Sequence, residues 1–225
     1  MATLRSASRT ATLQRPVSAS AGTPLPMRQH ILSIAEELYV LHGYGGFSFG
    51  HIAAATQTTR ANIHHHFGNK RQLMAELIEG FVADARARLT HHWTAGTASF
   101  AERMAAQIDD LHRFYDRFNR QPGDRNVWSP LARLRLDASA LGALAHGALE
   151  QTDRLYDVCL RQALKAAIAS GEFTADTPVD DVVCVLRVAL RSCPPMTQDS
   201  GSFADVERFL LALGRTVAAA WGGAR

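Results

Sequence analysis

The chain has 225 residues, of which 47% are hydrophobic and 20% are charged, a composition typical of folded globular proteins. No apolar run reaches the roughly 18 residues that a membrane-spanning helix needs. The net charge of +3 is too small to identify a nucleic-acid-binding protein by itself. We therefore expect a cytoplasmic protein with no membrane association, built from one large domain or from a small and a larger one.

Residues 1–26 are rich in Ala, Ser, Thr and Arg and show no apolar periodicity. Their three arginines account for the whole net charge, because the remaining 24 − 3 = 21 basic residues equal the 21 acidic ones. This composition predicts a disordered arm. A basic arm that touches DNA, an organelle transit peptide and a simple extension all remain open.

From residue 27 onward, apolar residues recur at helical spacing and the helix boundaries carry capping signals. Gly43 is expected to end the first helix, whereas Ser48, Thr59 and Asn69 are expected N-caps. Pro194 and Pro195 are expected to stop the next-to-last helix. The expected helices cover about 27–42, 48–55, 59–65, 70–92, 97–119, 127–136, 138–170, 178–193 and 202–221.

These nine or so helices, with no sustained two-residue alternation, predict an all-α protein. Cys159, Cys184 and Cys193 are widely separated and lie among apolar residues, which indicates buried reduced thiols rather than a disulfide framework or a zinc site. No cofactor motif and no catalytic constellation is found, so an enzyme is not expected.

The three short helices at about 27–42, 48–55 and 59–65 have the lengths and the tight second turn of a helix-turn-helix. The sequence features shared with one family are Gly43-Tyr44, Ser48, Ile52-Ala53, Thr59-Arg60, Asn62-Ile63, His65-His66-Phe67 and Asn69-Lys70. In order and spacing they resemble the DNA-binding domain of the TetR family of transcriptional repressors. The resemblance implies a DNA-binding domain over 27–72 and an effector-binding and dimerisation domain over 73–225.

The resemblance also implies which residues contact double-stranded operator DNA. Asn62 can pair with adenine, and Arg60 can contact phosphate or a guanine edge. The remaining expected contacts, mostly to phosphate, are Ser48, Thr58, Thr59, His64, His65 and Lys70. Four positions depart from the family pattern: Gln57 replaces a turn glycine, Thr58 a buried valine, Ala61 a frequent glycine and His64 a tyrosine. These departures leave the operator preference open.

Three consecutive histidines, His64-His65-His66, also raise the possibility of a metal site. Neighbouring helical residues point about 100° apart, so a triplet cannot converge on one ion. Ordinary surface or core histidines are the plain alternative. We expect His64 and His65 to face phosphates and His66 to turn towards the domain, with tighter DNA binding at lower pH.

The helical segment beyond residue 93 is expected to hold a pocket for an unknown small-molecule effector. Its candidate lining residues combine an apolar body with a polar group, although aromatic residues at helical spacing are more often core. They are Trp93, His112, Tyr115, Trp128, His146 and Tyr156.

The last two helices, about 178–193 and 202–221, carry apolar stripes that are either core or a homodimer interface. The resemblance favours the interface, and two reading heads on a pseudo-palindrome require two-fold symmetry. The expected function is a one-component regulator, a repressor released by its ligand. The alternatives are a helical small-molecule-binding protein or enzyme that does not use DNA binding, and an organelle-imported helical protein.

Overall fold

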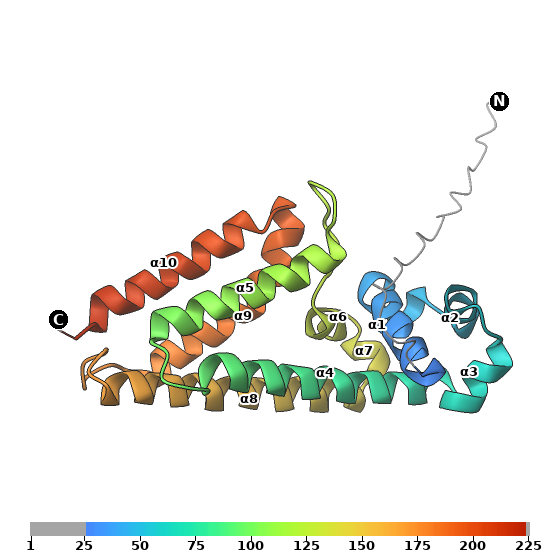
Figure 1. The fold of residues 1–225 in the computed structure, drawn as a ribbon, viewed down its shortest axis with the longest axis horizontal. Helices are drawn as coiled ribbons and strands as arrows, with labels where there is room; N and C mark the ends of the chain where they lie inside the picture. The colour runs from blue at the N-terminus through green and yellow to red at the C-terminus, as the bar shows by residue number, and fades with distance from the viewer. Residues whose placement is uncertain (1–25, 224–225) are drawn as a thin grey trace, which may run out of the picture.

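The structure is a computed structural model and describes residues 26–223. The arm expected over residues 1–26 lies outside the described residues except for Pro26. Over the described range the chain forms ten α-helices (Figure 1). They are α1 (Met27–Gly46), α2 (Phe49–Thr56), α3 (Arg60–Phe67), α4 (Lys70–Trp93), α5 (Phe100–Phe118), α6 (Pro130–Leu136), α7 (Ala138–Leu141), α8 (Ala143–Ala169), α9 (Val179–Ser200) and α10 (Ala204–Trp221).

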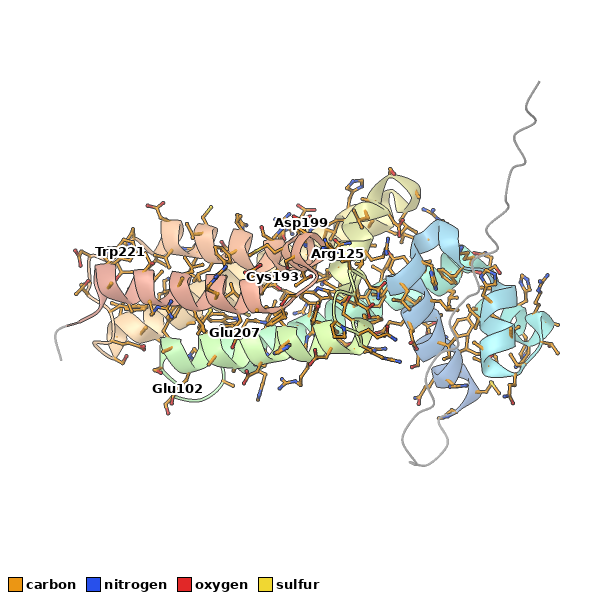
Figure 2. The ribbon with its side chains drawn as sticks, turned by 90° about the horizontal axis from the view of Figure 1, so that it is seen from above. Glu102, Arg125, Cys193, Asp199, Glu207 and Trp221 are labelled. Atoms are coloured by element: carbon orange, nitrogen blue, oxygen red, sulfur yellow. The ribbon has the colours of Figure 1, made fainter. Side chains whose placement is uncertain are left out.

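The molecule is elongated, with α1, α2 and α3 at one end and a larger helical bundle at the other (Figure 1). The long helices α4 and α8 lie side by side, and α9 packs on α8 while α10 packs on α9 and α5. Trp221 and Glu102 mark the end of the bundle that is farthest from the helix-turn-helix (Figure 2). The short helix α6 contacts both α1 and α8, and therefore lies where the two parts of the molecule meet.

The three predicted N-caps are confirmed, and they fix where the helices around the recognition element begin. The Ser48 hydroxyl accepts a hydrogen bond from the His51 amide at 3.3 Å, and the Thr59 hydroxyl accepts one from the Asn62 amide at 3.1 Å. Asn69 forms a reciprocal capping box with Gln72. Each cap satisfies amides that the first helical turn leaves without partners, and is worth about 1 kcal/mol.

The predicted helix boundaries are wrong at two places, and both have a physical reason. Pro194 and Pro195 do not stop α9, which continues to Ser200. An interior proline loses a backbone hydrogen bond and crowds the carbonyl four residues earlier, and burial of Pro194 against the rest of the bundle offsets that cost here. The segment 138–170 is not one helix, because Gly142 adopts φ 60° and ψ −131° and separates α7 from α8. The helices consequently number ten rather than nine.

Gly43 does interrupt the first helix, with φ 71° and ψ 177°, although helical hydrogen bonding resumes up to Gly46. The core is continuous from α1 to α10, and on α4 it includes Leu73, Leu77, Phe81 and Leu89. Cys159 and Cys193 are buried, whereas Cys184 is exposed, so the expectation of three buried thiols is wrong for Cys184. Cys184 lies on the side of α9 opposite the buried Val182 and Leu186. Within residues 26–223, no helix is long and apolar enough to span a bilayer.

Candidate functional site

The recognition helix α3 has one buried and one open face. Ile63 and Phe67 are buried against α1, α2 and α4, which fixes how the helix is rotated. The opposite face exposes Arg60, Ala61, His64 and His65. An eight-residue helix that presents its N-terminal residues in this way has the dimensions needed to enter a major groove.

The N-terminal end of α3 holds its polar side chains in defined positions. Asn62 donates from Nδ2 to the Thr58 hydroxyl at 2.9 Å. This bond orients the amide and leaves its oxygen and second N–H available for a base edge. The Arg60 guanidinium lies over Gly50, where a Cβ atom would come within 2.6 Å of its Nη2. Gly50 therefore gives Arg60 room to lie across the N-terminus of α2.

The three histidines of α3 differ in exposure, as their helical spacing predicts. His64 and His65 are exposed, whereas His66 is half-buried. The His64 Nδ1 lies 2.7 Å from the Gly68 carbonyl, and its ring meets the Phe49 ring edge-on at 4.8 Å. Across residues 26–223, no group of three or more His, Cys, Asp or Glu side chains is placed to hold a metal ion.

Lys70 does not reach outward as expected. Its ammonium donates to the carbonyls of Tyr44 and Phe47 and lies over both of their rings, at 4.6 and 4.3 Å. Burial lowers the pKa of Lys70, which fits an enclosed position. The expected phosphate contact by this ammonium is therefore corrected to a structural role: Lys70 holds the loop between α1 and α2.

The exposed cation at the start of α4 is instead Arg71, which the sequence analysis did not single out. The sequence did hold a signal for Arg71, because it lies two residues after the Asn69 cap and next to Lys70, an expected DNA contact. The segment 38–75 contains no Asp or Glu, but holds Arg60, Lys70, Arg71 and five histidines. Free amides at the capped N-termini of α2 and α4 add partial positive charge to this surface.

The turn of the helix-turn-helix carries local backbone strain. Gln57 has φ 54° and ψ 38°, and is the one residue other than glycine with positive φ among those the structure describes. This conformation explains why a glycine would suit the position, and costs a side-chain-bearing residue about 1 kcal/mol. The turn therefore keeps a left-handed backbone conformation although Gln57 stands where the family pattern has glycine.

Comparison with known proteins agrees with this geometry. The family described as "Bacterial regulatory proteins, tetR family" matches residues 31–77, which include the whole helix-turn-helix. Over these residues the chain is similar to the DNA-binding part of the TetR family. The HTH-type transcriptional repressor AcnR of Corynebacterium efficiens is 30% identical over 96 residues, a match that covers 43% of this chain and about half, 48%, of that relative.

The similarity in fold extends well beyond the helix-turn-helix, to solved structures that cover 83% and 88% of this chain. Reduced NemR of E. coli superimposes with a TM-score of 0.69 at 21% identity, covering 83% of this chain and 94% of that one. A TetR-family regulator from Cytophaga hutchinsonii superimposes with a TM-score of 0.71 at 16% identity, covering 88% and 96%. At these identities the similarity establishes the fold alone.

The six candidate effector contacts are not brought together. His112 and His146 are exposed on α5 and α8, and His112 stacks on Phe203, so neither faces a cavity. Trp93 and Tyr115 are buried core residues whose polar atoms bond to Gln107 and to the Gly201 carbonyl. The other two, Trp128 and Tyr156, line one small cavity inside the bundle.

This cavity has a volume of about 40 Å³ and lies between α4, α5, α6, α8 and α9. Arg88, Arg135 and Arg191 also line it, and the sequence analysis missed all three. Helical spacing could have identified two of these arginines as inward-facing. Arg88 lies three residues after the buried Ala85, and Arg135 lies four residues after the buried Leu131. Both cations therefore occupy positions that normally face the core.

Helix α6 joins this cavity to the DNA-binding domain. On one side its residues Leu131 and Arg135 line the cavity. On the other side Arg133 donates to the carbonyls of Val40 and Leu41 at 2.8 and 3.0 Å. Asp137, directly after α6, accepts a hydrogen bond from the Tyr44 amide. We call the Arg133 and Asp137 contacts with α1 the α6 clasp.

Proposed function

We propose that this protein is a homodimeric, cytoplasmic transcriptional repressor that binds a pseudo-palindromic operator and is released by a small-molecule effector. One observation carries the proposal: α3 presents Arg60, His64 and His65 outward from a segment of 38 residues without any carboxylate. Such a surface suits the phosphate backbone, while Arg60 and Asn62 are placed to read bases.

In this proposal Ser48, Thr59 and Arg71 position the domain on phosphates, together with the free amides of α2 and α4. Thr58 acts indirectly, by holding the Asn62 amide. Lys70 acts by holding the loop before α2 rather than by touching DNA.

Effector control would run through the elements that touch both sites. Arg88 on α4 and Leu131 on α6 line the cavity. The N-terminus of α4 follows the recognition helix, and the α6 clasp grips α1. An effector that separates α4 from α6 would thus change the position of the reading head, provided that it binds the released state more tightly than the operator-bound state.

The outer surface of α9 and α10 supports a homodimer. Val185 and Val188 on α9 are 50% and 53% exposed, and Phe209 and Leu211 on α10 are 39% and 40% exposed. Exposed apolar side chains on two adjacent helices favour a protein contact there. A two-fold axis at this surface would form a four-helix interface and leave both reading heads free.

DNA binding is tested by fluorescence anisotropy with the DNA upstream of the protein's own gene and a scrambled control, over a salt series. We expect preferential, salt-dependent binding that the Arg60→Ala variant weakens. Arg154→Ala is the matched control, because Arg154 is 73% exposed on α8 and outside the proposed surface. Equal, weak binding to several genomic fragments would favour a ligand-binding protein that does not use DNA.

The dimer is tested by light scattering during size-exclusion chromatography. We expect a dimer for the wild-type chain and a monomer for the Val185→Glu, Val188→Glu double variant. Leu136→Glu introduces the same change at an apolar residue that is 63% exposed on α6, and should remain dimeric. A double variant that stays dimeric would place the interface elsewhere.

A further inference from the structure

The cavity described above is lined by three arginines and, among its described lining residues, by no Asp or Glu. Arg88, Arg135 and Arg191 come from α4, α6 and α9, so three separate helices direct cations at one small space. Tyr156 from α8 adds a hydroxyl, and Phe114 and Trp128 supply apolar wall. Cations at core positions are costly to bury, so their convergence here calls for a counter-charge.

Two of the three guanidinium groups have buried N–H groups without acceptors. Arg88 stacks on the Phe114 ring at 3.9 Å, and its Nε and Nη1 are buried with no hydrogen-bond partner in the described part of the chain. Arg135 donates from Nη1 to the Leu131 carbonyl at 3.4 Å, but its Nη2 is likewise buried and unpartnered. Buried N–H donors nearly always have partners, so these are open positions for an acceptor.

The protein's own carboxylates only partly neutralise this cluster. Asp153 accepts a hydrogen bond from Arg191 at 2.9 Å and lies 3.7 Å from Arg135. Asp110 lies 3.7 Å from Arg88, beyond hydrogen-bonding distance, and also faces His92 and Arg113. Arg113 is 69% exposed, so solvent screens its charge, and the three cavity arginines against two carboxylates leave 3 − 2 = 1 positive charge in excess.

The ionisation of the neighbouring groups fits this arrangement. Burial lowers the pKa of Arg135, and the like charge of Arg191 lowers it further. Arginine nevertheless stays charged in proteins, so the unfavourable interaction between Arg135 and Arg191 remains. Burial raises the pKa of Tyr156, which keeps its hydroxyl protonated and able to donate a hydrogen bond.

We propose that the effector is a small monocarboxylate whose anionic group lies between Arg88 and Arg135 and receives a hydrogen bond from Tyr156. A planar carboxylate can accept two parallel N–H bonds from a guanidinium edge. One excess positive charge matches a monoanion better than a phosphate monoester, which carries about −1.5 to −2 at neutral pH. Phe114, Trp128 and Leu190 would enclose a short apolar body, and the small volume requires a compact ligand.

The anion site itself can be tested without DNA. Only its role as the effector site rests on the proposed function. Isothermal titration of the full chain would use butyrate, isobutyrate and benzoate as probes, with butyramide, benzamide and inorganic phosphate as comparisons. We expect at least one carboxylate to bind with a Kd below about 1 mM, while its amide and phosphate bind far more weakly. A carboxylate that binds no better than its amide, phosphate as the preferred ligand, or no binding at all would overturn the proposal.

Variants locate the site. Arg135→Gln should weaken carboxylate binding about tenfold or more, because a charge-assisted pair is lost. Arg154→Gln, on the exposed side of α8, should leave binding unchanged. If Arg135→Gln does not fold, Tyr156→Phe and Arg88→Lys provide the test and should each weaken binding measurably. Equal affinity in these variants and wild type would also overturn the proposal.

Different experimental results would contradict the proposed regulatory function and the proposed anion site. The anisotropy assay with upstream DNA is repeated at saturating carboxylate. A carboxylate that binds and needs Arg135 but leaves operator affinity unchanged would support the anion site and reject its role as effector. Operator binding without carboxylate binding would support the regulator and reject the anion site.

Discussion

The Asp137 carboxylate accepts a hydrogen bond from the backbone amide of Tyr44 at 2.8 Å, across 93 residues of sequence. The acceptor follows α6 in the C-terminal helical bundle, and the donor follows the Gly43 kink near the end of α1. A Cβ atom on Gly43 would lie only 3.1 Å from the same carboxylate, so this approach is close as well as specific. This hydrogen bond joins the C-terminal helical bundle to α1, next to the helix-turn-helix.

Replacing Asp137 by Ala should loosen this joint, because the Tyr44 amide would lose its acceptor at a cost of about 1–3 kcal/mol. All three tryptophans, Trp93, Trp128 and Trp221, lie outside the helix-turn-helix. Urea unfolding followed by tryptophan fluorescence therefore reports on the C-terminal helical bundle, whereas far-UV circular dichroism reports on both parts. We expect the two transitions to separate in Asp137→Ala. Coincident transitions with unchanged stability would argue against a mechanical joint.

The strained turn predicts a stabilising substitution. Gln57→Gly should raise the free energy of unfolding by about 0.5–1 kcal/mol, since glycine adopts positive φ without steric cost. The matched control is Gln151→Gly at an exposed position inside α8, where the same change should lower stability by about 1 kcal/mol. Chemical denaturation of both variants checks the opposite signs. Destabilisation by Gln57→Gly would mean that the glutamine side chain is needed in the turn.

DNA affinity should increase as the pH falls from 8 to 6. If His64 donates from Nδ1 to the Gly68 carbonyl, a neutral ring has no N–H left on Nε2, and only the protonated ring can also donate to a phosphate. A protonated His65 ring would likewise add positive charge beside the phosphates. Anisotropy at fixed salt measures the effect, which the His64→Gln, His65→Gln double variant should reduce. The variant His146→Gln should retain it, because His146 is exposed on α8. Equal wild-type affinity at the two pH values would contradict this prediction.

Lys70 and Arg71 should have opposite phenotypes although they are adjacent. Lys70→Met removes an ammonium that bonds to two loop carbonyls, and should lower the free energy of unfolding by about 1.5–3 kcal/mol. Arg71→Met should leave stability unchanged and reduce the slope of log affinity against log salt by about 1, the loss of one phosphate contact. A normal fold and a reduced salt slope in Lys70→Met would restore Lys70 as a DNA contact.

The sequence predicted the helix-turn-helix well because its signals are local. Ser48, Thr59 and Asn69 cap helices through amides three residues away, so residue type and spacing are enough to identify them. Helical spacing likewise predicted that His66 turns towards the domain, and His66 is half-buried while His64 and His65 are exposed.

The side-chain arrangement of the C-terminal helical bundle could not be predicted in this way, because its important contacts join distant helices. His112 and His146 looked suitable by residue type, but their rotation on α5 and α8 turns them to solvent. The orientation of Lys70 depends on the loop before α2, and the α6 clasp joins residues more than 90 positions apart. The persistence of α9 through Pro194 and Pro195 depends on burial that the sequence alone does not reveal.

Those two prolines have a consequence for how the cavity can grow. A proline nitrogen carries no hydrogen, so the carbonyls of Leu190 and Arg191 receive no bond from residues 194 and 195. Leu190, Arg191 and Pro194 all line the cavity. The wall formed by α9 is therefore weakest where a ligand would press against it, and the helix can bend outward there without breaking a backbone hydrogen bond at either position. A ligand larger than the resting cavity of about 40 Å³ can therefore enter if α9 bends outward. The α6 clasp meanwhile keeps α6 in place against α1.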